Sequence, residues 1–206
     1  MIKKFIAGGC SFTFGHELSD DKEGKIPSKK SWAYKLMTNG QATANDKYIC
    51  TARPGIGNSG IARRVFNAVA NTTEVRCVVV MWSFNSRYDW AMPRHKLLED
   101  TRWATISPWD TSMSNEERHN ALMGSEGQQE QWKFRKEMMQ ETKVQPFADA
   151  IYRYAANEYH ELYLGWKSII WLQNILEKKN IPYFFTLADN NLFYDNFDHH
   201  KIEMHL

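Results

Sequence analysis

The segment from Val75 to Met81, with the sequence Val-Arg-Cys-Val-Val-Val-Met, constrains the fold more than any other part of the chain. Successive side chains of a β-strand point to opposite faces, so a strand of this composition is apolar on both of them. Such strands are typical of parallel sheets, whose two faces are both covered. The segment therefore predicts a central strand of a parallel sheet.

Two shorter apolar segments precede it, at residues 2–8 and at Tyr48–Cys50. Each of the three predicted strands runs into a turn of small or polar residues, and the first two turns are rich in glycine. Apolar residues at helical spacing follow the first two turns, which predicts helices over 31–39 and from Ile61 to Asn71. A strand, turn and helix in repeated order predict βαβ units and a parallel sheet.

The second half of the chain is less regular. Residues 86–146 do not continue the repeated order of strand, turn and helix, although Asn115–Met123 and Gln128–Glu141 could be helical. A helical pattern over Phe147–Lys179, with a break expected near Gly165, leads to a last buried strand at Tyr183–Leu187. We expect a single domain over 1–206, a three-layer α/β/α sandwich with a central parallel sheet and a Trp-rich insertion at about 86–146. Such an insertion is either a lid over a site or an ordinary surface elaboration.

Composition excludes several classes of protein. With a net charge of only +2, the chain as a whole lacks the excess of positive charge that would indicate nucleic-acid binding. The three widely spaced cysteines argue against a disulfide scaffold or a Cys-x-x-Cys zinc site. No apolar run approaches the ~18 residues of a membrane span, and the N-terminus does not have the pattern of a signal peptide. We therefore expect a cytoplasmic protein without nucleic-acid or membrane partners, located in the host cytoplasm in the case of a viral protein.

The turn Gly8-Gly9-Cys10-Ser11 after the first strand is a candidate for chemistry. In open α/β sheets, ligands bind at the carboxyl ends of the strands. Glycines allow a substrate to approach backbone N–H groups closely, and a serine on such a turn can act as a nucleophile when a base reaches it. The alternative is that Ser11 merely caps the next element.

Three segments together resemble the conserved blocks of the SGNH (GDSL-like) hydrolases. Gly9-Cys10-Ser11-Phe12-Thr13 is similar to the first block, with Cys10 in place of the family's aspartate, as in SGNH-like proteins of bacteriophages. Gly57-Asn58-Ser59-Gly60 is similar to the second block, and Val78–Asn85 has the layout of the third. The three blocks occur in the family's order, each at a predicted strand end, within residues 5–90.

The resemblance implies an SGNH-type, flavodoxin-like fold and a serine esterase that forms an acyl-enzyme on Ser11. The N–H groups of Ser11 and Gly57 and the side-chain amide of Asn85 would stabilise the oxyanion. A small-molecule ester is the implied substrate, such as an O-acylated carbohydrate, and neither a metal nor an organic cofactor is required.

The family's fourth block, Asp-x-x-His near the C-terminus, has no match in this chain. Asp198 and His200 are the candidates for the orienting carboxylate and the general base, at altered spacing. His16, close to Ser11 in the chain, is a substitute candidate. The alternatives are a chain that lacks its own base, or an inactive SGNH-like viral binding or structural protein. The tail histidines are a weaker candidate for a metal site.

The insertion contains three tryptophans that we take as candidates for substrate binding, since indole faces pack against sugar and aromatic rings. They are Trp90, Trp103 and Trp109. A third class of function, dinucleotide binding, follows from the Gly-x-Gly-x-x-Gly spacing at Gly55–Gly60. It lacks the acidic residue that would be expected at the end of the following strand, where Trp82-Ser83 stands.

Overall fold

The computed structural model describes residues 3–20, 25–39, 46–91, 103–113 and 143–189. The chain divides into two compact units. The first consists of Met1–Asn85 and Tyr159–Leu206, and the second of Ser86–Glu158. The second unit begins at the residue where the insertion was expected to begin, and extends beyond its expected end.

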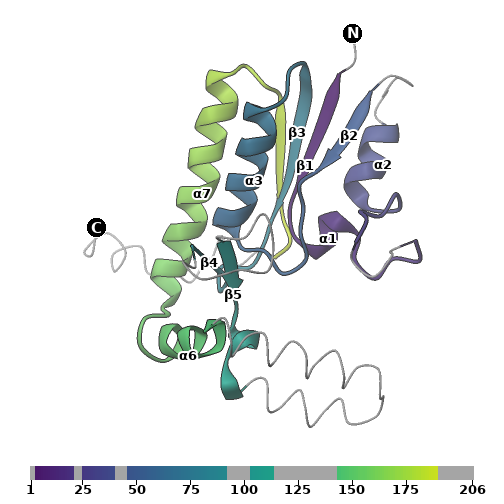
Figure 1. Cartoon of the computed structure of the whole chain (residues 1–206). Helices are drawn as coiled ribbons and strands as arrows, with labels where there is room; N and C mark the ends of the chain where they lie inside the picture. Colours follow the sequence, from purple (N-terminus) through teal and green to yellow (C-terminus); the bar gives the residue numbers. More distant parts are fainter. Residues whose placement is uncertain (1–2, 21–24, 40–45, 92–102, 114–142, 190–206) are drawn as a thin grey trace. The chain divides into compact units, whose positions relative to one another are not determined.

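The first unit is an α/β structure built on a four-stranded sheet. Its strands β1 (Lys4–Gly8), β2 (Lys47–Cys50), β3 (Val75–Trp82) and β6 (Tyr183–Leu187) have the order β2-β1-β3-β6. All three pairings are parallel, as Figure 1 shows. The predictions of a parallel sheet and of a central strand at Val75–Met81 are therefore confirmed.

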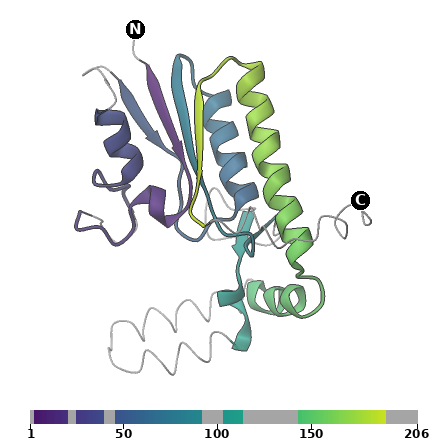
Figure 2. The same ribbon diagram turned by 180° about the vertical axis from the view of Figure 1, so that it is seen from behind.

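Helices pack against both faces of this sheet. The helices α3 (Asn58–Ala70) and α7 (Glu158–Lys178) lie side by side on one face, and α2 (Trp32–Asn39) lies on the other (Figures 1 and 2). A single-turn helix, α1 (Ser11–Phe14), follows β1. Two separate clusters of buried side chains result, one under each set of helices.

The sequence of the central strands explains the two clusters. In β3, Val78, Val80 and Trp82 belong to the cluster under α3 and α7, whereas Val79 belongs to the cluster under α2. The neighbouring strand β1 alternates in the same way, since Ile6 faces α3 and Phe5 and Ala7 face α2. A period of two residues therefore distributes each strand's apolar side chains between both faces.

One sequence prediction about the C-terminal helices was wrong. The break in the C-terminal helical segment falls at Ala155–Asn157, between α6 (Val144–Tyr154) and α7, and not at Gly165. There the N–H groups of Ala155 and Ala156 both donate to Ile151 O, at 2.8 Å each, which closes α6. Gly165 is buried inside α7, because an interior glycine costs a helix only ~1 kcal/mol and does not by itself end it.

The second unit contains elements that the sequence did not predict. Strands β4 (Tyr88–Ala91) and β5 (Trp103–Ile106) form an antiparallel pair, followed by a 3₁₀ turn η1 at Pro108–Asp110 and by α6. Tyr152 of α6 ties the pair together, because its hydroxyl donates to Ile106 O (3.1 Å) and to Ser86 O. The helices expected at 115–123 and 128–141 lie outside the described residues.

None of the helices in the described ranges combines the length and the apolar character that crossing a membrane requires.

Leu172 provides a test of this packing, because its side chain is fully buried in the cluster between α7 and the sheet. We expect Leu172→Ala to lower the free energy of unfolding by about 2–5 kcal/mol, through lost burial and the cavity left behind. Ile170→Ala is the matched control, since Ile170 lies on the same helix but is 56% exposed. Urea unfolding monitored by tryptophan fluorescence measures both. Equal effects of the two substitutions would contradict the packing of α7.

Candidate active site

The first turn leaves β1 through a backbone that only glycine fits. Gly9 has a φ of +151°. A Cβ added there would lie 2.1 Å from Thr13 Oγ1 and 3.1 Å from Met81 O, at the end of β3. The turn is therefore pressed against β3, and the chain can enter α1 directly after it.

Cys10 and Ser11 take different environments in this turn. The side chain of Cys10 is fully buried in the cluster under α3, whereas Ser11 is half-buried and forms the first residue of α1. The cap position is that of Cys10, which forms no side-chain cap hydrogen bond. The expectation that Ser11 caps the next element is thus wrong, since Ser11 lies one position inside it.

Backbone hydrogen bonds join the second turn to the first. The N–H of Thr51 donates to Ala7 O at 2.8 Å, and the N–H of Arg53 donates to Gly9 O at 3.1 Å. The chain then reaches Gly57, which is buried and caps α3, with its carbonyl accepting from Ile61 N at 2.9 Å. The turn that carries Gly57 is therefore continuous with the turn that carries Ser11.

The side chain of Asn58 joins the third turn to the second. Its Oδ1 accepts from Ser83 N at 2.7 Å, and its Nδ2 donates to Ser83 O at 3.2 Å. The same Nδ2 lies 3.4 Å from Asn85 Oδ1 and donates to it. Asn58 is only 4% exposed, so its two bonds with Ser83 are shielded from water, whereas its bond with Asn85 is partly buried.

The strand order explains why these turns meet. The chain passes from β1 to β2 on one side and then to β3 on the other, so β1 and β3 are neighbours whose connections run in opposite directions. In doubly wound sheets this switch point opens a crevice at the carboxyl ends of the strands, where ligands bind. Ser11 follows β1 and Asn85 follows β3, and Gly57 starts the helix that leads into β3.

The edge carries donors suited to a negatively charged group. Within the described part of the chain, the backbone N–H groups of Ser11 and Gly57 donate no hydrogen bond to another residue. The side chain of Asn85, whose oxygen accepts from Asn58 Nδ2 at 3.4 Å, adds an amide group at the same edge. Preorganised donors of this kind stabilise the oxyanion of an acyl-transfer reaction.

The expected base and its partner lie outside the described residues, since these do not include Asp198 and His200. The described histidines are His16 and His160, and both are exposed. In the described ranges no cluster of three His, Cys, Asp or Glu side chains suits a metal ion.

The three candidate tryptophans belong to the second unit, and each is at least 39% exposed. The register of the antiparallel pair sets Trp90 opposite Ala104 and Trp103 opposite Ala91. Residues directly opposite each other share a face and successive residues alternate, so Trp90 and Trp103 lie on different faces of the pair. Trp90 packs edge-on against Phe147, with ring centroids 5.3 Å apart. One face of β4 and β5 therefore cannot present both indoles.

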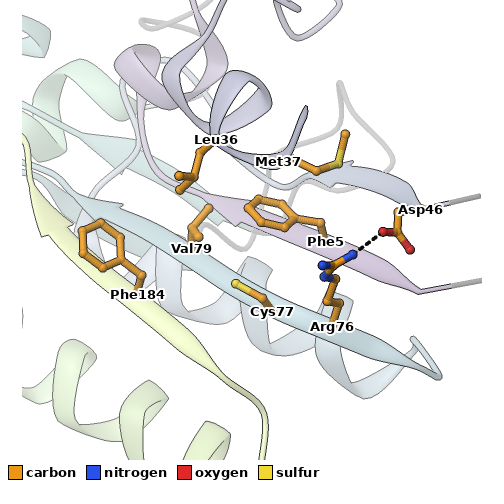
Figure 3. A pocket seen from close by; sticks show the side chains of 8 residues that line it. All are labelled: Phe5, Leu36, Met37, Asp46, Arg76, Cys77, Val79 and Phe184. Carbon is orange, nitrogen blue, oxygen red and sulfur yellow. Dashed lines mark hydrogen bonds and ion pairs between the residues drawn. The ribbon is translucent and has the colours of Figure 1, made fainter. Parts of the chain in front are cut away.

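A separate hollow of about 330 Å³ lies on the α2 face of the sheet. Figure 3 shows its lining, in which apolar side chains from β1, β3, β6 and α2 surround the Cys77 thiol, and the Arg76–Asp46 ion pair closes one end. Burial raises the pKa of Cys77, which keeps its thiol neutral. Phe5 lies near the start of β1 and Ser11 beyond its end, so the hollow and the three turns are at different places on the sheet.

Sequence reasoning missed Asn58. Asn58 lies within the second block and no role was predicted for it, yet its side chain forms the hydrogen bonds to the third turn. The signal was an asparagine directly between a capping glycine and an apolar helix, at a position that the helical spacing of Ile61, Val65 and Val69 places toward the sheet. A buried asparagine requires hydrogen-bond partners, and the turn after β3 is the segment that supplies them.

Comparison of the chain with models of known protein families, with curated proteins and with solved structures finds no match.

Gly9 tests the contact between the first turn and β3. We expect Gly9→Ala to destabilise the fold by more than the ~1–3 kcal/mol of backbone strain, because the new Cβ would also collide with Thr13 and approach Met81 O. Gly55→Ala is the matched control, since Gly55 also has a positive φ, of +79°, but nothing lies within 4 Å of its added Cβ. Thermal unfolding measures the stability of both variants, and an equal loss of stability in the two would mean that the first turn is not tightly packed.

Asp20, in the loop that follows α1, predicts a pH dependence. Its carboxylate accepts hydrogen bonds from Ser28 Oγ and from Lys29 N (2.9 Å), and the Ser28 hydroxyl lowers the pKa of Asp20 below its usual range. A depressed folded-state pKa adds stability that is present above the unfolded value and is lost as pH falls through the folded value. We therefore expect Asp20→Asn to destabilise the protein at pH 7 and to have a smaller effect at a pH below the ordinary aspartate pKa of about 3.9. Urea titrations at the two pH values measure the difference, and a loss that is independent of pH would contradict it.

Proposed function

We propose that the protein is an ester hydrolase of the SGNH type, in which Ser11 is the nucleophile. The observation that carries the proposal is the hydrogen-bonded junction of three turns at the switch point of a parallel sheet. Arg53 N to Gly9 O joins the first two turns, and Asn58 joins the second and third. The first of these turns carries a half-buried serine hydroxyl, and the other two carry hydrogen-bond donors.

In the proposed reaction, Ser11 Oγ attacks the ester carbonyl while a base takes its proton. The N–H groups of Ser11 and Gly57 and the amide of Asn85 stabilise the negative oxygen of the tetrahedral intermediate. The C–O bond to the alcohol then breaks, and the base returns the proton to the leaving alcohol. Water hydrolyses the acyl-enzyme by the same steps and restores Ser11.

The base in this proposal is His200, oriented by Asp198, with His16 as the substitute. The proposed substrate is a small ester such as an O-acylated carbohydrate.

A second candidate function is ligand binding at the same sheet edge without turnover. It is favoured by one observation in the sequence, which has no Asp-x-x-His after Tyr183–Leu187. Activity measurements must decide between the two candidates.

Replacement of Ser11 is the direct test. We expect Ser11→Ala to lower kcat for p-nitrophenyl acetate by a factor of about 10³ or more, since the covalent step is lost. Ser59→Ala is the matched control, because Ser59 is an exposed serine at the start of α3 and has no role in the proposed reaction. Equal rates of hydrolysis by the wild type and by Ser11→Ala would rule out the proposed hydrolase and leave ligand binding as the candidate function.

The base is then located with two single variants. We expect His200→Ala to reduce kcat by about 10²–10⁴-fold, the usual contribution of general base catalysis, and His16→Ala to leave it unchanged. The reverse result would assign the proton transfer to His16.

A further inference from the structure

We propose that Asn58 is a positioning residue that fixes the oxyanion donors Asn85 and Gly57 relative to each other. This inference rests on the proposed function for its catalytic consequence. Its structural part, that Asn58 sets the orientation of the Asn85 amide, stands on the geometry of the described residues.

The side-chain amide of Asn58 pairs with both polar groups of the Ser83 backbone. It accepts from Ser83 N at 2.7 Å and donates to Ser83 O at 3.2 Å. This is the pair of bonds that a neighbouring strand would offer, and it occurs at the first residue after β3 ends at Trp82. Asn58 therefore fixes the backbone of Ser83 where the chain leaves β3.

The amide of asparagine suits this position because it offers an acceptor and two donors at a fixed spacing. An aspartate would keep the acceptor for Ser83 N but would set a carboxylate oxygen against Ser83 O and Asn85 Oδ1. With the side chain only 4% exposed, that arrangement would also bury a charge, which is costly without a cationic partner.

The same side chain reaches Asn85, two residues further along the turn. Asn58 Nδ2 donates to Asn85 Oδ1 at 3.4 Å. Because the amide group is planar, holding its oxygen also sets the direction of its N–H bonds. A donor contributes to oxyanion stabilisation only when it is aimed before the charge develops, and the required precision is about 0.5 Å.

Asn58 is also covalently joined to Gly57, whose backbone N–H is the second proposed donor. Gly57 is buried and caps α3. One residue thus links a donor at the start of α3 with a donor after β3. A shift of the third turn relative to α3 would change the distance between the two donors, and the Asn58 bonds oppose that shift.

Kinetics of single and double variants test this role. For p-nitrophenyl acetate we expect Asn58→Ala to lower kcat about 10–100-fold with KM nearly unchanged, a little less than the ~10²–10³-fold expected for Asn85→Ala. In a protein that already carries Asn85→Ala, adding Asn58→Ala should lower kcat by less than about threefold, because the effects of substitutions at interacting residues are not additive. A full additional loss in that background would overturn the positioning role. Asn67→Ala, an exposed asparagine of the same helix, is the matched control and should leave kcat unchanged.

A second readout does not depend on activity. The side-chain NH₂ signal of Asn85 is assigned in ¹⁵N–¹H spectra by its loss in Asn85→Ala. In Asn58→Ala and Asn58→Asp we expect this signal to move toward the position of a solvent-exposed asparagine, and in Asn67→Ala we expect it to stay. If Ser11→Ala leaves hydrolysis unchanged, the proposed function fails, and this spectrum still decides the orienting role. An unmoved Asn85 signal in folded Asn58→Ala would overturn it.

Discussion

The position of β1 between β2 and β3 is the constraint on which the rest of this structure depends. Parallel pairing forces the three strands to end at the same edge, so three turns that are far apart in the sequence must share a small region. Hydrogen bonds then convert this closeness into a fixed arrangement, because Arg53 N is bonded to Gly9 O and Asn58 is bonded to Ser83. The turns can carry polar groups at this edge because the strands behind them are buried by helices on both faces.

The two faces of the sheet are covered unequally. The long helices α3 and α7 bury one face with a large apolar cluster, whereas the short α2 buries a smaller cluster on the other. As a result, Phe184 and Leu36 are 54% and 44% exposed beside the hollow on the α2 face. The turns that carry Ser11 and Gly57 depend mainly on the better covered face, since Cys10, Ile56 and Ile61 all pack there. The rigidity of the candidate site therefore comes from α3 and its contacts.

The sequence predicted those elements whose burial dictates their composition. Val75–Met81 is apolar on both faces because β3 is an inner strand of the sheet. Tyr183–Leu187 was correctly predicted as a strand, but the expectation that it is buried was wrong, since β6 is the last strand in the described sheet and Phe184 is 54% exposed. Strands β4 and β5 were not predicted, since four-residue strands such as Tyr-Asp-Trp-Ala carry no apolar alternation long enough to recognise. The break at Gly165 was predicted wrongly because glycine weakens a helix less than the tertiary packing of Leu162 and Leu172 stabilises it. The role of Asn58 required the partner on another strand, which no local pattern contains.

Cys10 and Ser11 are adjacent in the first turn but lie in different environments. Ser11 is half-buried at the sheet edge, while Cys10 is fully buried among Ile56, Ile61 and the side chains of β1. An ionised aspartate in that environment would need a cationic or hydrogen-bonding partner, whereas a thiol packs as a small apolar group. Burial in the core therefore favours a small apolar side chain at position 10, whereas position 11, at the edge of the sheet, can carry a polar one. A cysteine at position 10 therefore fits this packing, and the proposal that Ser11 is the nucleophile does not require an aspartate there.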